Sequence, residues 1–309
     1  MPLINEIKPQ TKIKGRYLCK YKQILKNKSD KEYVTLRLQD KSGTADAKIW
    51  DINKYIDDFE VFDIVEIEAE ALMYQNTLQL KIVQLKKVEE KCDLSDFMPQ
   101  TKRDVNDLET RFFGYIDKIQ DKYLKQLLEN IYLKQGVFDE FKLHAASKSV
   151  HHSYLNGLLE HTICTTRIGE MIANVYEGVK VDLVIAGCML HDIGKLVELT
   201  ALPTSDYSAE GQLLGHIIIG AQLVHDEIKK IEGFPKETAL VLEHIILSHH
   251  GEYEYGSPKR PKCMEAMAVH LADYTDSRMK ILEEAMDNLE PGESTYNKFL
   301  DRTIRRLGY

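Results

Sequence analysis

The chain changes its hydrophobic period once, and this change constrains the fold more than any other feature. Up to about residue 88, apolar and polar residues alternate as in half-buried strands, for example at Val34, Leu36 and Leu38. A polar segment that contains Pro99 follows at residues 89–102. Beyond it, apolar residues recur with the 3.6-residue period of amphipathic helices. The sequence therefore predicts a β-rich N-terminal part and an all-helical C-terminal part.

The strand-like region predicts five strands. A long strand over 13–25 is followed by a hairpin with strands at 33–38 and 45–49. A short helix at 51–59, with Asp51 as its N-cap, is expected before a second hairpin that turns at Gln75 and Asn76. This order is that of a small OB-type Greek-key barrel. We therefore expect an OB-type domain at residues 1–90, in a multidomain protein of the α+β class.

The helical region predicts eight helices. Residues 91–135 are expected to form a linker and connecting helices, and residues 136–309 the main all-α bundle. The expected helices span 105–119, 123–133, 137–143, 154–176, 181–191, 214–231, 236–248 and 262–289.

Cysteine usage and apolar runs indicate the compartment. The five cysteines are odd in number and far apart, which is typical of reduced thiols in a cytosolic protein rather than of disulfides. No apolar run reaches the roughly 18 residues of a membrane span. The N-terminus lacks the basic-then-apolar pattern of a secretory signal. We expect a cytoplasmic protein without a membrane partner.

An apolar run at 184–190 ends in His191-Asp192-Ile193-Gly194-Lys195, and all eleven histidines lie at or after His144. A neutral imidazole beside a carboxylate offers one nitrogen and one oxygen ligand to a divalent metal. Lys195 lies one helical turn beyond His191, so its ammonium can reach an anion held on that metal. Gly194 is expected to adopt a positive φ at the helix exit.

Further candidate ligands follow at intervals of about one helix and one loop. A helical bundle can point each such group inward from a different helix. A single histidine on an apolar helix is more often a hydrogen-bonded core residue, but the ordered set favours a metal centre. His225 and His244 are expected to lie outside it. The candidate ligands are His161, His191, Asp192, His216, His249, His250 and Asp273, and the sequence does not decide between His249 and His250.

The order of these ligands resembles the H…HD…D pattern of the HD-domain superfamily of metal-dependent phosphohydrolases. The resemblance implies that His161, His191, Asp192 and Asp273 hold a first metal. His216, with His249 or His250, is similar to the additional ligands of two-metal members. Ligation by nitrogen and oxygen alone favours Mn²⁺, Fe²⁺, Mg²⁺, Co²⁺ or Zn²⁺.

The segments 150–162 and 248–252, after an OB-type domain, are similar to those of the YhaM-type 3′→5′ exoribonucleases over nearly the whole chain. That resemblance implies two Mn²⁺ ions and removal of nucleotides from the 3′ ends of single-stranded RNA, with single-stranded DNA as an alternative. Two metals ~3.5–4 Å apart would clamp the phosphodiester and lower the pKa of a bound water.

Three side chains are expected to act in catalysis. Asp192 would bridge the two ions, and Lys195 would neutralise charge on the scissile phosphate. His151 or His152 would hydrogen-bond the phosphate or protonate the leaving group, and we assign this role to His152.

The N-terminal end is basic. Residues 1–31 carry nine Lys and Arg against Glu6 and Asp30, whereas the whole chain has a net charge of −8. This balance indicates either a polyanion-binding surface or a solvated, lysine-rich strand face. Aromatic residues interleave with the cations, as in single-strand-binding proteins. Trp50 is expected to lie in the core. The candidate nucleic-acid-binding residues are Lys14, Arg16, Tyr17, Lys20, Tyr21, Lys22, Tyr33 and Tyr74.

Two other functions stay open at this point. An HD-type phosphohydrolase acting on free nucleotides or cyclic dinucleotides would need no basic, strand-tracking barrel. A non-catalytic nucleic-acid-binding protein with a structural metal would have no use for Lys195. The sequence does not decide the metal identity, the preference for RNA over DNA, or whether the chain forms a homo-oligomer.

Overall fold

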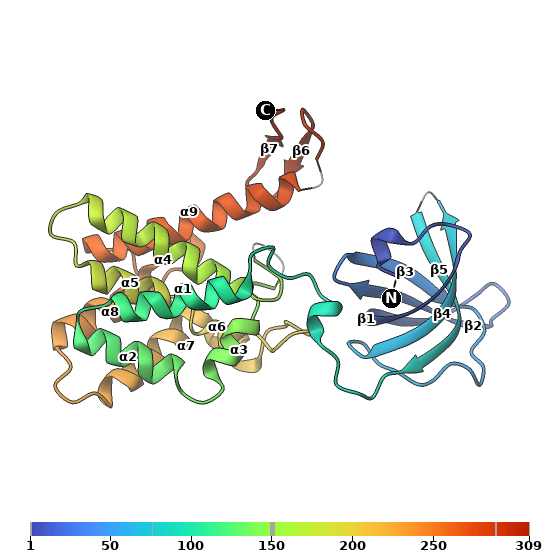
Figure 1. The fold of residues 1–309 in the computed structure, drawn as a ribbon, viewed down its shortest axis with the longest axis horizontal. Coiled ribbons are helices and arrows are strands. Elements are labelled where there is room, and N and C mark those ends of the chain that lie inside the picture. The colour runs from blue at the N-terminus through green and yellow to red at the C-terminus, as the bar shows by residue number, and fades with distance from the viewer. Residues whose placement is uncertain (1, 76, 149–151, 288, 309) are drawn as a thin grey trace. The chain divides into compact units, whose positions relative to one another are not determined.

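The structure, a computed structural model, describes residues 2–75, 77–148, 152–287 and 289–308. It divides into two compact units, residues 1–100 and 101–309. Figure 1 shows a β-barrel in the first unit and a bundle of helices in the second. The predicted mixed α+β class is confirmed. Among the described residues, no helix combines the length and apolarity that crossing a bilayer requires.

The first unit is a closed five-stranded barrel, as predicted. Its strands run in the order β1-β2-β3-β5-β4, and β1 closes the barrel by pairing antiparallel with both β2 and β4. β3 and β5 pair in parallel. The expected turn between β4 and β5 includes Asn76, which lies outside the described residues. The strands are β1 (Lys12–Lys26), β2 (Glu32–Asp40), β3 (Gly43–Ile49), β4 (Ile64–Tyr74) and β5 (Thr77–Lys87), with short 3-10 turns η1 (Ile4–Glu6) and η2 (Leu94–Asp96).

The helix expected at residues 51–59 is absent from this described segment, so that prediction is wrong. Leu85 of β5 donates its N–H to the carbonyl of Tyr55 (3.0 Å), and its own carbonyl accepts from the N–H of Asp57 (3.0 Å). These cross-chain bonds use the backbone groups that a helix would pair internally. Asp51 caps nothing and instead lies 2.9 Å from the Nζ of Lys31.

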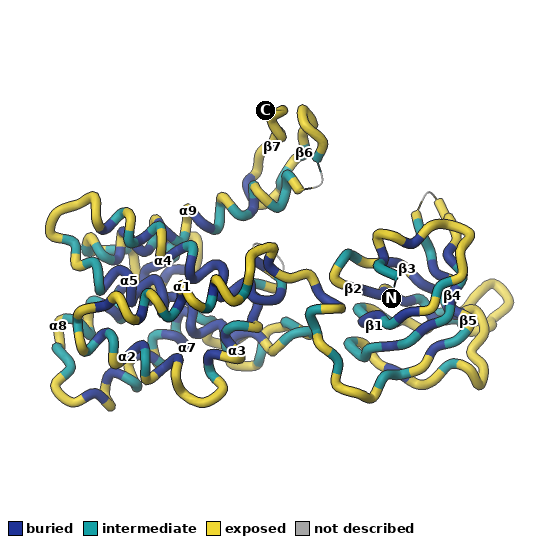
Figure 2. Tube along the Cα trace, in the orientation of Figure 1, coloured by how far each residue is buried: buried dark blue, intermediate teal, exposed yellow. Residues whose placement is uncertain are grey.

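The second unit contains all eight predicted helices, with ends within a few residues of those expected, and the short α6, which was not predicted. Residues 183–190 of α5 are all buried, and Figure 2 shows this helix inside the bundle. The helices are α1 (Val105–Lys118), α2 (Lys122–Tyr132), α3 (Val137–Leu143), α4 (Gly157–Val175), α5 (Val181–Leu190), α6 (Lys195–Glu198), α7 (Ala209–Lys229), α8 (Lys236–Ser248) and α9 (Met264–Met286), with the 3-10 turn η3 (Tyr253–Tyr255).

Helix α5 packs against α4, α8 and α9. An apolar helix surrounded by others in this way carries the residue that follows it into the centre of the domain. His191 and Asp192, which come directly after α5, are accordingly buried.

A β-hairpin at the C-terminal end was not predicted from the sequence. Its strands are β6 (Ser294–Asn297) and β7 (Arg302–Arg305), which pair antiparallel beyond the end of α9 (Figure 1). Leu300 and Ile304 of the hairpin are buried in one apolar cluster with Ile281 of α9. This cluster fixes the hairpin to the helix.

Candidate metal centre and nucleic-acid interface

Four ligand atoms from three segments meet at one point in the second unit. The Nε2 of His161, on α4, lies 3.2 Å from the Nε2 of His191 and 3.4 Å from Oδ2 of Asp192. It lies 3.3 Å from Oδ1 of Asp273, on α9. Divalent metals bind such atoms at about 2.0–2.2 Å, which places neighbouring ligand atoms about 3–3.5 Å apart. The four side chains therefore have the spacing of a metal site.

A second group lies beside the first. Oδ1 of Asp192 and the Nε2 atoms of His216 and His249 are buried without a hydrogen-bond partner among the residues that the structure describes. Oδ1 of Asp192 lies 3.6 Å from the Nε2 of His216 and 3.8 Å from that of His249. Buried polar atoms rarely stay unpaired, because each costs about 1–3 kcal/mol. The donor set therefore fits a second cation, with one oxygen of Asp192 toward each group.

Both members of the His249–His250 pair belong to this second group. One ligand atom each from His216, His249 and His250 lies within 4.8 Å of the other two. The sequence left open which of the pair is a ligand, and the geometry favours both.

Each candidate ligand histidine is oriented through its Nδ1. For His191, His249 and His250 the acceptors are backbone carbonyls, whereas His161 and His216 face carboxylates. A proton held on Nδ1 leaves the Nε2 lone pair for a metal. The partners are Cys188 O for His191 (2.7 Å), Ile246 O for His249 (2.8 Å), Tyr255 O for His250 (2.9 Å), Asp276 for His161 (2.7 Å) and Glu198 for His216 (2.9 Å).

Two glycines allow His216 to lie next to Asp192. Gly194 has φ −63°, so the positive φ expected from the sequence is wrong. A Cβ on Gly194 would lie 2.1 Å from the carbonyl oxygen of His216. Glycine is required at this position because α7 approaches its backbone so closely. Gly215 interrupts α7 at φ +73°, a conformation that favours glycine. The following N–H, of His216, donates to Oε1 of Glu198 at 2.9 Å.

The role predicted for His152 is wrong. This histidine is only 1% exposed. Its Nε2 lies 3.0 Å from Asp276 and its Nδ1 2.9 Å from the hydroxyl of Tyr154. Both ring nitrogens thus have protein partners, and the side chain contacts Asp276, which in turn lies 2.7 Å from Nδ1 of His161. His151, the alternative candidate, lies outside the described residues.

The charges of the centre depend on one another. Burial opposes ionisation of Asp192, but Lys195 and His191 outweigh it and hold the pKa of this carboxyl well below its ordinary value. Burial alone would lower the pKa of His161, yet hydrogen bonds to Asp192, Asp273 and Asp276 raise it well above the usual value. A bound divalent cation would replace the proton on His161.

His249 is affected in the opposite direction. Burial, then the neighbouring imidazoles of His250 and His191, lower the pKa of His249 well below its ordinary value. A neutral imidazole is the form that binds metal. His249 is therefore ready to act as a ligand at neutral pH.

Most of the basic residues predicted to contact nucleic acid on β1 are paired within the barrel. Lys14 lies 2.9 Å from Glu68, and Arg16 lies 3.3 Å from Glu66. Lys22 lies 3.4 Å from Glu60. The alternation of lysine on β1 with glutamate on β4 gives a solvated, charge-balanced face, which agrees with the second interpretation of the basic N-terminus.

The aromatic and remaining basic candidates divide by exposure. Tyr17 is fully buried, and its hydroxyl donates to Pro2 O at 2.9 Å, so its predicted base contact is wrong. Tyr21 is exposed, and its hydroxyl lies 2.5 Å from Gln23. The Nζ of Lys20 lies 5.8 Å from the ring centroid of Phe62.

Tyr33, Lys48, Trp50 and Tyr74 form a cluster on the barrel, here called the aromatic–lysine cluster, in which Trp50 and Tyr74 are exposed and the other two side chains are partly buried. The rings of Tyr33 and Trp50 stack at 4.8 Å between centroids. The Nζ of Lys48 lies 5.7, 4.9 and 5.6 Å from the centroids of Tyr33, Trp50 and Tyr74. Trp50 is 41% exposed, so the prediction that it lies in the core is wrong. Lys48 was not predicted.

Comparison with known proteins agrees with the geometry of the helical unit. Residues 158–278 match the family model described as HD domain. This segment of the helical unit is therefore similar to the HD domain family. All seven candidate ligands lie within the matched residues: His161, His191, Asp192, His216, His249, His250 and Asp273.

Solved structures similar to the chain include two OB domains. The second OB-fold domain of replication protein A from Methanococcus maripaludis is 16% identical, with a TM-score of 0.24, over 29% of this chain and 96% of that chain. An OB domain from Thermoplasma acidophilum is 14% identical, with a TM-score of 0.24, over 30% and 91%. The OB-type topology described above rests on the strand pairing of this barrel.

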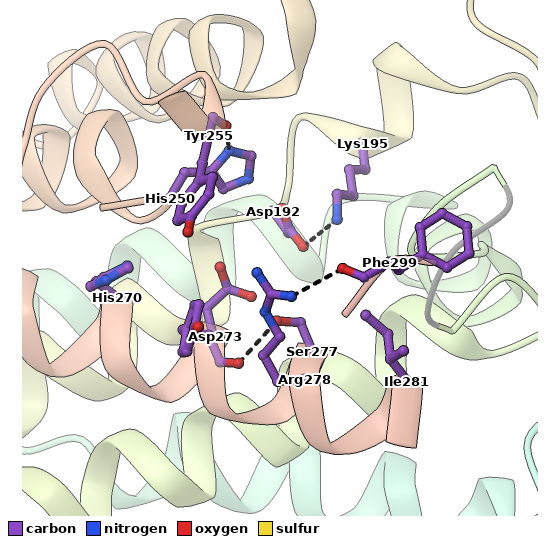
Figure 3. Close-up of a pocket in the computed structure, with 11 residues that line it drawn as sticks. Asp192, Lys195, His250, Tyr255, His270, Asp273, Ser277, Arg278, Ile281 and Phe299 are labelled. Atoms are coloured by element: carbon purple, nitrogen blue, oxygen red, sulfur yellow. Dashed lines mark hydrogen bonds and ion pairs between the residues drawn. The ribbon is translucent and has the colours of Figure 1, made fainter. Parts of the chain in front are cut away.

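A cavity of about 290 Å³ opens beside the candidate metal ligands of the helical unit. Asp192 and Asp273 lie in its wall, and Lys195 reaches into it with Nζ 2.7 Å from Oδ2 of Asp192 (Figure 3). The guanidinium of Arg278 also points into the cavity and donates to the carbonyl of Phe299 at 3.3 Å. Neither Arg278 nor Phe299 was predicted. The sequence carries no signal for them, because Arg278 stands five residues after Asp273, off its helix face, and Phe299 comes from the unpredicted hairpin.

Three other histidines of residues 158–278 lie outside the two ligand groups. His225 lies 2.7 Å from Glu243 on the surface, and the Nε2 of His244 accepts from the N–H of Lys262 at 2.9 Å. Both placements were predicted. The Nδ1 of His270 lies 2.8 Å from the carbonyl of His249, and a Cβ on Gly251 would lie 2.1 Å from its ring. His270 therefore braces the loop that carries the histidine pair.

Proposed function

We propose that the chain is a metal-dependent 3′→5′ exonuclease that hydrolyses phosphodiester bonds of single-stranded RNA, with single-stranded DNA as a second substrate. Residues 136–309 would cleave, residues 1–90 would bind the strand, and residues 91–135 would connect them. The observation that carries the proposal is the set of three buried atoms without hydrogen-bond partners, Oδ1 of Asp192 and Nε2 of His216 and His249, beside the four-atom group around His161. That arrangement supports a two-metal rather than a one-metal centre.

The residues divide naturally between two cations, most simply Mn²⁺. His161, His191, Asp192 and Asp273 would hold one, while Asp192, His216, His249 and His250 would hold the other. Cations bound there would supply an acidified water and charge stabilisation at the attacking and leaving oxygens of a phosphodiester. Asp192 would belong to both sites through its two carboxylate oxygens.

Two side chains of the cavity suit an anionic substrate. Lys195 is almost fully buried and holds its ammonium 2.7 Å from Asp192, so a phosphate placed beside that carboxylate would also meet a cation. Arg278 adds a guanidinium on the facing side of the cavity. A planar guanidinium can bind two phosphate oxygens at once. These residues would neutralise the phosphodiester and hold it in place.

The barrel supports a single strand rather than a free nucleotide as substrate. Exposed, stacked rings with a cation at their centre are the kind of platform on which unpaired bases stack. In the aromatic–lysine cluster the partly buried ring of Tyr33 stacks on the exposed ring of Trp50, directly after β3. The Nζ of Lys48 lies near both Trp50 and the exposed ring of Tyr74 on β4. Together with the exposed Tyr21, this cluster replaces the β1 cations as the proposed strand-binding surface.

The proposal is tested with 5′-labelled single-stranded RNA and Mn²⁺. The expected product pattern is a ladder that shortens from the 3′ end, which Asp192→Asn abolishes and the surface variant His225→Gln leaves unchanged. Parallel reactions with nucleoside monophosphates and cyclic dinucleotides test the alternative phosphohydrolase. RNA that stays intact with Mn²⁺, Fe²⁺, Mg²⁺, Co²⁺ and Zn²⁺, while a small nucleotide is hydrolysed, would reject the exonuclease and support that alternative.

A further inference from the structure

The cavity beside the metal ligands has two chemically different ends. Asp192, Lys195 and Asp273 make one end charged. Ile281 and Phe299 line the other, and Figure 3 shows them on the side away from Asp273. A ligand that fills this cavity needs an anionic part and an apolar, flat or compact part. A nucleotide has both.

Phe299 is presented to the cavity by a well-fixed turn. It lies between β6 and β7, where the side-chain oxygen of Asn297 accepts from the N–H groups of Phe299 (3.0 Å) and Leu300 (3.1 Å). Leu300 is buried against Ile281 and Ile304. The backbone is therefore held, yet Phe299 stays 46% exposed. An apolar ring kept in the open by an anchored turn is available for stacking.

Two cations lie next to Phe299. The Nζ of Lys298 lies 5.0 Å from the centroid of its ring, and the guanidinium of Arg278 donates to its backbone carbonyl at 3.3 Å. An aromatic ring with cations around it attracts both the face of a base and the phosphates of a strand.

Arg278 connects the two ends of the cavity. Its guanidinium lies between the charged wall and Phe299, and it donates to the carbonyl of Phe299 at 3.3 Å. The hairpin thus fixes the orientation of this cation. About 290 Å³ is near the small end of ligand cavities, so the space suits one nucleotide rather than several.

We propose that the C-terminal hairpin forms the pocket for the 3′-terminal nucleotide: Phe299 stacks on its base, and Arg278, held by the carbonyl of Phe299, binds its phosphate next to Lys195. This inference rests on the proposed function, because it names the part of the strand that occupies the cavity. Phe299 is then a specificity-determining residue that recognises a base without a base-specific hydrogen bond.

The test compares two ligands that differ only by the base. Binding of adenosine 5′-monophosphate and of ribose 5-phosphate to the Mn²⁺-loaded full chain is measured by calorimetry. The wild-type chain is expected to bind the nucleotide about 10-fold more tightly, in line with base stacking on aromatic rings. Phe299→Ala should remove this preference, and Phe299→Trp should keep it. Tyr296→Ala, which removes another exposed ring of the hairpin, should leave the preference unchanged and is the control.

A second measurement separates stacking from a merely structural effect. On RNA that ends in a 3′ adenosine, Phe299→Ala should lower kcat/KM about 10-fold, mainly through KM. On RNA whose 3′-terminal nucleotide lacks its base, the same variant should match the wild type. Equal losses on both RNAs, equal losses for both small ligands, or an unchanged base preference would each overturn the proposal. The calorimetric comparison needs no hydrolysis, so it stands even if the exonuclease assay fails, and an active exonuclease without the base preference rejects the pocket alone.

Discussion

Oδ1 of Asp192 lies 3.6 Å from Nε2 of His216, and neither buried atom has a hydrogen-bond partner in the described part of the chain. The other oxygen of the same carboxylate, Oδ2, lies 3.3 Å from Nε2 of His191. One side chain at the end of α5 thus faces both ligand groups. The account of this protein as a two-metal hydrolase depends on that position.

Replacing Asp192 by asparagine removes a charge from both groups at once. We expect the variant to lose bound Mn²⁺ and to hydrolyse RNA more than about 100-fold more slowly, while it binds single-stranded RNA as the wild type does. Metal per chain is measured by elemental analysis and RNA affinity by fluorescence anisotropy. His225→Gln is the matched control, and a variant that keeps full turnover would contradict the role of Asp192.

Asp276 is expected to act through His161 rather than as a ligand. Its Oδ2 lies 2.7 Å from Nδ1 of His161. Loss of such an orienting carboxylate typically costs 10- to 100-fold in metal affinity. Asp276→Asn should therefore weaken Mn²⁺ binding by about that factor but leave the metal stoichiometry at saturation unchanged. A lower stoichiometry at saturating metal would instead identify Asp276 as a ligand.

The stability of the metal-free protein should depend on pH through His161. Its pKa in the folded chain is raised above the ordinary value of about 6.5, so protonated His161 stabilises the fold at and below that pH, and this contribution is lost as the pH rises through the raised pKa. The pKa values of His152, His249 and His250 are lowered in the folded chain. These groups therefore reduce the free energy of unfolding only below about pH 6.5, where the unfolded chain binds more protons than the folded one.

The gap in Tm between Mn²⁺-loaded and chelator-treated protein should consequently widen as the pH rises above about 6.5, since a bound cation takes the place of the proton on His161. Differential scanning calorimetry from pH 6.5 to 9 measures this gap. Asp276→Asn, which removes one carboxylate facing His161, should make the slope smaller. A gap that narrows with pH would be inconsistent with a protonated His161 in the metal-free state.

Trp50 offers the clearest test of the barrel. Because stacking of a base on an aromatic ring contributes about 1–3 kcal/mol, Trp50→Ala should weaken single-stranded RNA binding about 5- to 100-fold. Cleavage of a dinucleotide, too short to reach a second binding surface, should be unaffected. Lys14→Gln is the control, because Lys14 is already paired with Glu68, and its effect on affinity should be small. Equal losses in the two variants would argue against the aromatic–lysine cluster.

The sequence predicted which candidate ligands the structure brings together, because residue type and spacing are sufficient for this. His161, His191, Asp192 and Asp273 stand on or at the ends of helices whose apolar faces are evident, so burial brings them together. The five strands followed equally from alternation. The features that the sequence did not predict depend on contacts between distant segments. The pairing of residues 55–57 with Leu85 removes an expected helix.

Burial of individual side chains was the least predictable property. Tyr17 and Trp50 are both aromatic residues of the barrel, yet one fills the core and the other is exposed. Only the direction of each side chain relative to the closed barrel decides this. His152 likewise stands near the ligands in sequence but is enclosed by Tyr154 and Asp276. Arg278 and Phe299 become part of the site only because an unpredicted hairpin folds back on α9.

The most direct test of the two-metal account is anomalous scattering at the manganese edge from crystals grown with Mn²⁺. The account predicts two peaks ~3.5–4 Å apart, one within reach of His161, His191 and Asp273 and the other within reach of His216, His249 and His250, with Asp192 touching both. A single peak bound only by the first group, or peaks away from Asp192, would contradict it.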